Sequence, residues 1–504
     1  MQRRRGVWCL VVLGSVMGAA ACGTTVPSAS QTNQASSGLS GAGTAPGGSA
    51  VAGSGPSAPG SSPSGNAAVA STGVGQTTGT SSQPLGGSGS STAPVTADGI
   101  PTTGPGWDAK NIYVGLTTEN DTSTALKAAG IDFDPGDPNK QSAAILKDIN
   151  GHGGLFGRKL VLIVHDNQTA QIAYNAPTVA EANCAYFTQD HHVAILMNWI
   201  IVSAAPCLAR TRTPDFELNA VLFNDSYYKQ FGPFLYTVVT PNATALAATF
   251  VKRLGAAGYL TGWNTVTHSP GKAPVKVGIY MADTPASRSV SNTMISLLKR
   301  AGVAIDEFYY DDRNPDSYGS QAQAAVLKFK ADGVTHVLNI PSGGVPMLFF
   351  IQNARTQNYY PRFGFTSYFS PGTQSSYFSP AQLSGAMGVG WQPTHDVAPE
   401  FQPAPSAAAK RCDAIMASAG VSSDAKGMCD AFYLFVAAAK AGHGLDAAAL
   451  SRGLVAIGQT FAPASTYGSG ISTSGHALPG KVRDLAYFDA CQCVKYTSPP
   501  MAFE

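Results

Sequence analysis

Short apolar strand patterns alternate with amphipathic helix patterns along most of this chain, and this alternation limits the folds that it can adopt. Four strand patterns come first: Ile112–Leu116, Lys159–Val164, Val193–Met197 and Phe234–Val239. Lys140–Asn150, between the first two, has apolar residues at helical spacing. Strands that alternate with helices form parallel sheets that are covered by helices on both faces. The first part of the chain therefore predicts one such lobe.

A second alternating run follows a Gly- and Pro-rich connection at His268–Pro274. Its strand patterns are Val275–Met281, Ile305–Tyr310, His336–Ile340 and Arg362–Thr366. A chain of 504 residues is also about twice what one hydrophobic core usually supports. The sequence thus predicts an α/β protein with two doubly wound parallel-sheet lobes. Because parallel sheets bind ligands beyond the carboxyl ends of their strands, it also predicts a ligand cleft between the lobes.

The first 22 residues have the layout of an export signal. Arg3, Arg4 and Arg5 precede an apolar run of about a dozen residues, which is too short to span ~30 Å of hydrocarbon. Residues 1–21 are therefore predicted to be a signal peptide. The small residues before Cys22 resemble the lipobox of bacterial lipoproteins, which implies that Cys22 is lipidated. The alternative is an ordinary signal peptide with a chance cysteine.

Residues 22–106 are predicted to be a flexible tether. No Asp, Glu, Lys or Arg occurs from Gly6 to Ala97, and Gly, Ser, Thr, Ala and Pro dominate this stretch. Such a composition cannot bury enough apolar surface to offset the entropy of ordering. A coil of about 85 residues has a root-mean-square reach of roughly 50 Å. We therefore expect a folded domain that a lipid anchor holds at the outer face of a bacterial cell membrane.

The charge balance excludes one class of partner. Without Arg3, Arg4 and Arg5, the 32 basic residues become 29, against 30 acidic residues. Nucleic-acid binding requires a basic surface, so no nucleic-acid partner is expected.

The remaining cysteines predict disulfides. Once Cys9 is removed with the signal peptide and Cys22 is reserved for lipid, an even number remains in an exported chain. Pairing of sequence neighbours is the simplest of the fifteen possible arrangements and gives Cys184–Cys207, Cys412–Cys429 and Cys491–Cys493. A metal or redox site is the alternative, although the sequence has no CxxC motif and no His cluster near these cysteines.

Motifs of enzymes and cofactor sites are missing. Gly151–Gly157 contains a dinucleotide-like glycine pattern, but it follows a helix and precedes a strand, the reverse of the required order. The sequence has no GxxxxGK[ST], HExxH or GxSxG motif. His191–His192 lacks a third spaced ligand, and Asp132, Asp134 and Asp137 lack EF-hand spacing. No metal and no cofactor are expected, and a secreted enzyme is the least favoured class.

Three segments resemble the type I periplasmic binding proteins. In ILKDINGHGGLFGRKLVLIVHDNQ, Ile145–Gln168, a helix ends in Ile-Asn before a Gly-Gly turn, another Gly, a strand and an Asp, as in the first lobe of that family. IQNARTQNYYPRFGFTS is similar to its second-lobe helix and strand, and LPGKVRDLAYFDACQCVKY to its C-terminal return. The resemblance covers residues 111–496 and is closest to the branched-chain amino acid and amide receptor group.

This resemblance implies an extracytoplasmic solute-binding receptor, not an enzyme. Such a receptor delivers a small molecule, amino-acid-like or amide-like, to the permease subunits of an ABC importer by cleft closure. It implies three crossings between the lobes, with residues 107–240 and 382–461 in lobe one and 241–381 and 462–504 in lobe two. The alternative is the same fold used as a ligand sensor or envelope interaction module without transport.

Candidate ligand-binding residues follow the expected strands. They are Thr118, Glu119, Asn198, Trp199 and Asn219 in lobe one and Asp283, Ser287, Ser342, Thr366 and Tyr368 in lobe two. Each is either a ligand contact or part of a solvated loop or helix cap, and Asp283 and Ser287 suit caps especially. The resemblance also implies a serine-rich loop that holds a ligand carboxylate, but residues 197–202 are MNWIIV. The solute is therefore either an α-amino acid or a less charged, more aromatic molecule.

Overall fold

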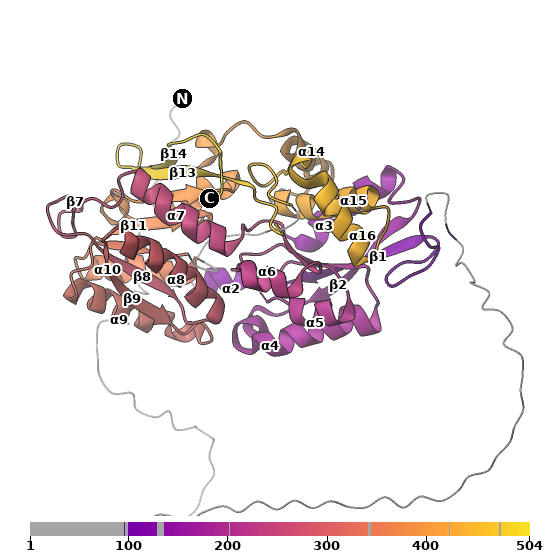
Figure 1. Cartoon of the computed structure of the whole chain (residues 1–504), viewed down its shortest axis with the longest axis horizontal. Helices are drawn as coiled ribbons and strands as arrows, with labels where there is room; N and C mark the ends of the chain where they lie inside the picture. The colour runs from indigo at the N-terminus through magenta and orange to yellow at the C-terminus, as the bar shows by residue number, and fades with distance from the viewer. Residues whose placement is uncertain are drawn as a thin grey trace, which may run out of the picture. The chain divides into compact units, whose positions relative to one another are not determined.

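The computed structural model (Figure 1) describes Val95 and residues 99–128, 136–200, 202–340, 344–422, 424–472 and 475–504. The predicted signal peptide, the lipidation site Cys22 and the tether as far as residue 94 lie outside the described residues. Among the residues that are described, no helix is long and apolar enough to cross a membrane.

Parallel strands form the first sheet, in the order β2-β1-β3-β4-β5. They are β1 (Asn111–Thr118), β2 (Lys159–Asp166), β3 (Ile195–Asn198), β4 (Asp215–Glu217) and β5 (Leu235–Thr237). One face packs on α3 (Pro138–Gly151), α14 (Ala407–Ser418), α15 (Lys426–Gly442) and α16 (Ala447–Ile457). The other face carries α4 (Thr169–Ala185), α5 (Ala205–Thr211) and α6 (Asp225–Phe231), as Figure 1 shows. The short α2 (Thr122–Ala128) follows β1.

The second sheet has the order β14-β13-β12-β11-β10-β8-β9. Its strands β9-β8-β10-β11-β12 repeat the order β2-β1-β3-β4-β5 of the first sheet. Its parallel strands are β8 (Lys276–Ala282), β9 (Ala304–Tyr310), β10 (His336–Leu338), β11 (Arg362–Thr366) and β12 (Met387–Gly390). One face packs on α7 (Ala243–Ala256) and α8 (Pro285–Arg300), and the other on α9 (Tyr318–Ala331) and α10 (Val345–Thr356). The remaining short elements are β6 (Trp263–Asn264), β7 (Ser269–Pro270), α11 (Pro371–Gln374), α12 (Pro380–Leu383) and α13 (Pro393–Asp396).

The structure confirms the predicted α/β class with two doubly wound parallel sheets. The strands have nearly continuous apolar sequences because helices cover both faces of each sheet. One edge differs from the expectation, since β13 (Lys481–Phe488), β14 (Cys493–Tyr496) and β15 (Met501–Ala502) pair antiparallel. The four residues between β13 and β14 are too few for a parallel crossover, so the chain must turn back as a hairpin.

Two of the predicted boundaries between lobes are corrected by backbone pairing. Residues 387–390 were expected in lobe one, but β12 pairs with β11 and β13 inside the second sheet. Residues 462–480 were expected in lobe two, but Ala477 forms a parallel bridge with Thr237 of the first sheet. In the same stretch, the backbone N–H groups of Ala464 and Ser465 donate to the buried carboxylate of Asp430 over 2.6 and 2.8 Å.

The predicted end of the tether at residue 106 is also corrected. Ile100 and Trp107 lie in the first hydrophobic core. The buried guanidinium group of Arg158 donates from Nη2 to the Pro101 carbonyl over 2.9 Å and from Nε to the Asp108 carbonyl over 2.7 Å. A buried charged group must have hydrogen-bond acceptors, and this segment supplies them. The fold therefore includes residues 99–106.

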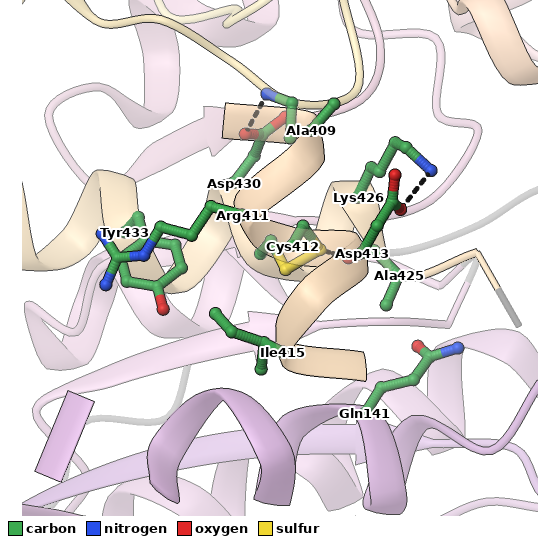
Figure 2. Close-up of a disulfide and its surroundings, with 12 residues drawn as sticks. Gln141, Ala409, Arg411, Cys412, Asp413, Ile415, Ala425, Lys426, Asp430 and Tyr433 are labelled. Carbon is green, nitrogen blue, oxygen red and sulfur yellow. Dashed lines mark hydrogen bonds and ion pairs between the residues drawn. A yellow bond between two sulfur atoms is a disulfide. The ribbon is translucent and has the colours of Figure 1, made fainter. Parts of the chain in front are cut away.

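The structure confirms the three disulfides, which are Cys184–Cys207, Cys412–Cys429 and Cys491–Cys493. Cys412–Cys429 joins α14 to α15, and both of its cysteines are buried in the first core. Figure 2 shows this bridge, with Arg411 beside the ring of Tyr433, where the guanidinium carbon lies 4.2 Å from the ring centroid. The bridge thus holds together two helices that come late in the chain but complete the first lobe.

We expect the Cys412→Ser/Cys429→Ser double variant to lose about 3 kcal/mol of unfolding free energy, because a bridge across 17 positions restricts the unfolded chain. Urea denaturation of the wild type and the variant measures the loss. The Cys184→Ser/Cys207→Ser pair, across 23 positions, should lose a similar amount. A loss below about 1 kcal/mol for both pairs would contradict the structural role.

Candidate functional site

One row of polar side chains crosses the first sheet beside its carboxyl edge. The strand register places them next to one another in the order His165, Thr117, Asn198, Glu217 and Thr237. The residues that precede the last four in their strands all belong to the core under α3 and α14–α16. Successive side chains of a strand point to opposite faces, so the polar row faces α4, α5 and α6.

The middle of this row lies where the strand order reverses, between β1 and β3. The Thr117 hydroxyl donates to Asn198 Oδ1 over 2.7 Å and accepts from the backbone N–H of Trp199 over 2.8 Å. Thr117 and Asn198 are both buried. Doubly wound sheets bind ligands in the crevice at this reversal. The hydroxyl of Thr117 therefore fixes the loop that lines the expected ligand position.

The Asn198 amide holds the same loop from the other side. Its Nδ2 donates to the Val202 carbonyl over 2.9 Å and to Glu217 Oε2 over 2.8 Å. An amide group has two N–H donors, and both are engaged with protein here. The two N–H groups of Asn198 thus bond the protein, and direct ligand contact by Asn198 stays a prediction.

Trp199 and Asn219 lie together at this edge. Asn219 Nδ2 donates to the Trp199 carbonyl over 2.5 Å, so the loops after β3 and β4 are bonded to each other. The indole of Trp199 is partly buried and packs against the first core, with the rest of its surface exposed. Trp199 is thus held at its backbone and is partly exposed as a residue.

Acidic groups gather after β1 and β2. The Thr118 hydroxyl donates to Asp166 Oδ1 over 2.8 Å, and the backbone N–H of Asn120 donates to the same oxygen over 3.2 Å. Glu119 is partly exposed, and burial raises its pKa, with a smaller contribution from the charge of Asp121. Thr118 is therefore a scaffold residue, while Glu119 offers a carboxyl group at the edge of the sheet.

The second sheet repeats the arrangement with an asparagine at the end of its third strand. Asn339 follows β10, is buried, and donates from Nδ2 to the Tyr280 carbonyl of β8. Thr366, at the end of β11, is fully buried, and its hydroxyl has no partner among the described residues. Ser342 lies outside the described residues. Thr117 and Asn339 were not among the candidates predicted from sequence. The register of β1 with β3 places Thr117 beside Asn198, and Asn339 directly follows β10.

Asp283 and Ser287 occupy the start of α8 in the way the sequence suggested as an alternative to ligand contact. Thr284 is the capping residue, because its hydroxyl accepts from the Ser287 N–H over 3.1 Å. The exposed Asp283 carboxylate pairs with Arg288 over 2.8 Å. The hydrogen bond and charge of Arg288 lower the pKa of Asp283. These bonds explain both residues as parts of a helix start.

Tyr368 connects the two halves of the site. It is buried, and its hydroxyl donates to the Val221 carbonyl, beyond β4 of the first sheet, over 2.9 Å. A second bond runs from Asn224 Nδ2, at the start of α6, to Ser289 Oγ of α8 over 2.9 Å. Two hydrogen bonds thus join loops and helix starts of the first lobe to those of the second lobe.

Two buried carboxyl groups lie beneath the loop after β3. Asp215 and Glu217 share one face of β4 and are fully buried, and neither oxygen of Asp215 nor Oε1 of Glu217 has a partner among the described residues. Burial raises the pKa of Glu217 to about 7. Burial and the neighbouring Glu217 charge raise the pKa of Asp215 well above its usual value. One proton held between the pair would join one oxygen of Asp215 to one oxygen of Glu217.

We expect this pair to make stability depend on pH. An unfolded carboxyl group titrates near pH 4, so the folded protein binds the shared proton more tightly. The pair's contribution is complete below about pH 4 and is lost as the pH rises through about 7. Urea denaturation at pH 5 and pH 8 should show a smaller drop for Glu217→Gln than for wild type. The exposed Glu181→Gln is the control, and an equal drop in all three proteins would contradict the shared proton.

The described residues contain no group of three or more His, Cys, Asp or Glu side chains that could hold a metal ion.

The chain belongs to the periplasmic binding protein family, whose model matches residues 141–481. No curated protein matches the sequence closely enough to count as a relative. This is a family of solute-binding receptors of ABC transporters, not of enzymes.

Solved structures share the fold at low identity. A possible leucine/isoleucine/valine-binding protein from Rhodopirellula baltica is 15% identical, with a TM-score of 0.55 over 79% of this chain and 98% of its own. A solute-binding protein from Rhodopseudomonas palustris in complex with p-hydroxybenzoic acid is 13% identical, with a TM-score of 0.55 over 78% and 98%. The protein LivJ from Streptococcus pneumoniae in complex with isoleucine is 14% identical, with a TM-score of 0.52 over 77% and 100%.

Proposed function

We propose that this protein is a receptor that binds a small solute between its two lobes and delivers it to the permease subunits of an ABC importer. The observation that carries the proposal is the repeated strand reversal. In each sheet, the edge where β1 meets β3, or β8 meets β10, is fixed by a buried asparagine bonded to the neighbouring strand. The bonds of Tyr368 and Asn224 join the two edges, which supports a solute position between them.

The side chains at these edges favour a solute that is small, amino-acid-like or amide-like. Glu119 offers a carboxyl group that can accept from an amine or amide N–H, and Trp199 offers an aromatic face. Neighbours of the same fold were solved with isoleucine and with p-hydroxybenzoic acid, which are respectively a zwitterion and an aromatic acid. Both chemical classes are candidate solutes, and the thermal-shift experiment distinguishes them.

The proposal places the receptor at the outer face of a bacterial cell membrane. Its support is in the sequence: three arginines, an apolar run and small residues before Cys22, followed by a long stretch without charges. Two or more acyl chains on one cysteine would give stable anchoring, since each buried CH₂ contributes about 0.8 kcal/mol. Mass spectrometry of the protein extracted from its membrane tests the lipid on Cys22.

Thermal unfolding of the compact Ser88–Glu504 unit tests solute binding. Bound solute is first stripped, and the protein is then heated with amino acids, amides, short peptides, sugars and aromatic acids. A solute at 100 times its Kd should add about 2.7 kcal/mol of stability, because it binds only the folded state. A selective shift identifies the chemical class. No shift across the panel, with the fragment folded, would favour a sensor or interaction module instead.

The Trp199→Ala variant tests the position of the site. We expect it to lose the fluorescence change on solute binding and to weaken affinity at least about tenfold, or ~1.4 kcal/mol, without unfolding. Titration of the solute that gives the thermal shift measures both effects. Trp263→Phe is the matched control, since Trp263 is buried and bonded to the Tyr360 carbonyl in the second lobe. Unchanged affinity in Trp199→Ala would remove Trp199 from the site.

A further inference from the structure

The three disulfides differ in their surroundings. Cys184–Cys207 and Cys412–Cys429 join separate helices, and all four of their cysteines are buried. Cys491–Cys493 joins two positions of one hairpin tip, with Cys491 and residues 488–492 around it exposed. Stabilisation by a disulfide grows with the length of the loop that it closes, so this bridge restricts the unfolded chain least.

The hairpin tip does not need the bridge in order to close. Phe488 of β13 pairs with Cys493 of β14, and the ladder continues from there through the antiparallel register. The backbone N–H of Gln492 donates to the Asp489 carbonyl over 3.3 Å, which closes the turn. Breaking the sulfur–sulfur bond would thus leave the backbone bonds of the hairpin in place. A bridge that is both accessible and dispensable for the fold has the character of a reactive site.

We propose that Cys491–Cys493 is a reversible thiol–disulfide exchange site, which reacts with a thiol compound outside the cytoplasm while the two buried disulfides stay intact. This proposal concerns the edge of the second sheet and does not rest on solute binding. Cys491 is the sulfur that is attacked, because Cys491 is exposed while Cys493 is only 9% exposed.

The exchange takes place in two steps. The thiolate of a first thiol, RSH, attacks Cys491 Sγ, so that an R–S–S–Cys491 bond forms and the Cys491–Cys493 bond breaks. The electron pair leaves on Cys493 Sγ, which takes up the proton that RSH lost. A second RSH attacks the mixed disulfide at the sulfur of R and releases Cys491 as a thiol. Two RSH are oxidised to RSSR, and the bridge is reduced to two thiols; RSSR drives the reverse reaction.

Charged side chains of both signs lie close to Cys493 in the chain. Lys495 lies two residues further along β14, on the same face as Cys493. Its ammonium group is 5.8 Å from the centroid of the Phe488 ring, and Phe488 is the direct partner of Cys493. A nearby positive charge stabilises a thiolate. The neighbouring acid, Asp489, accepts a hydrogen bond from the Ser384 hydroxyl over 3.0 Å.

Graded glutathione redox buffers test the proposal on the full chain. After equilibration and acid quenching, thiols are alkylated and read by tandem mass spectrometry of their peptides, where Cys491 and Cys493 share one peptide that is separate from Cys22 and from the buried cysteines. We expect Cys491 and Cys493 to be reduced at a reducing strength at least about tenfold lower than the four buried cysteines require. Simultaneous reduction of all three bridges, or later reduction of Cys491–Cys493, would overturn the proposal.

Single variants test which sulfur is attacked. With oxidised glutathione, Cys493→Ser should accumulate a glutathione adduct on Cys491, because no second thiol is present to resolve it. Cys491→Ser should accumulate at least about tenfold less adduct on the buried Cys493. Equal adducts on the two variants would overturn the assignment of Cys491.

The double variant Cys491→Ser/Cys493→Ser separates a reactive bridge from a structural one. Its melting temperature should fall by less than about 2 °C, since the backbone closes the hairpin. The Cys412→Ser/Cys429→Ser variant is the matched control and should fall by more. Equal falls in the two double variants would show that Cys491–Cys493 is a structural staple and would overturn the proposal.

Discussion

The Thr117 hydroxyl and its bonds across the first sheet are the interaction on which the candidate site depends. Through one oxygen, β1 is bonded both to the Asn198 side chain of β3 and to the Trp199 backbone beyond it. Asn198 extends the connection to Glu217 of β4. The side chains of Thr117, Asn198 and Glu217 are all buried, so the bonds between them form where water does not compete. These bonds therefore tie β1, β3 and β4 together at the carboxyl edge of the first sheet.

The same physical requirement explains how distant parts of the chain complete the first lobe. Asp430 is buried on α15, and burial raises its pKa to about 6. Its carboxylate is satisfied by the backbone of residues 464–465, which come from the stretch that returns toward the second sheet. Trp391 of the second lobe likewise donates to the Val239 carbonyl over 2.9 Å. Buried polar groups thus fix the segments through which the chain passes from one sheet to the other.

Of the ten candidate ligand residues, six have partners within the protein, and their contact with a solute stays a prediction. Asn198, Asn219, Thr118 and Tyr368 are bonded within the protein, and Asp283 and Ser287 belong to the start of α8. Glu119 and Trp199 remain as the residues that combine exposure with suitable chemistry. Position after a strand and the local caps at Asp283 and Ser287 could be predicted from sequence. The bonds of Asn198 to Glu217 and of Tyr368 to Val221 could not, because these partners lie 19 and 147 residues away.

The sequence by itself determined the class of fold, because this follows from local pattern, whereas it offered the disulfide pairing only as the simplest of fifteen arrangements. Strand and helix periodicity is set within a few turns, and each bridge joins cysteines that are sequence neighbours. Only the tertiary structure decided which sheet β12 and residues 462–480 join, and that residues 99–106 belong to the fold. Those choices depend on pairing between strands and on acceptors for Asp430 and Arg158, and long-range contacts leave no periodic signal in the chain.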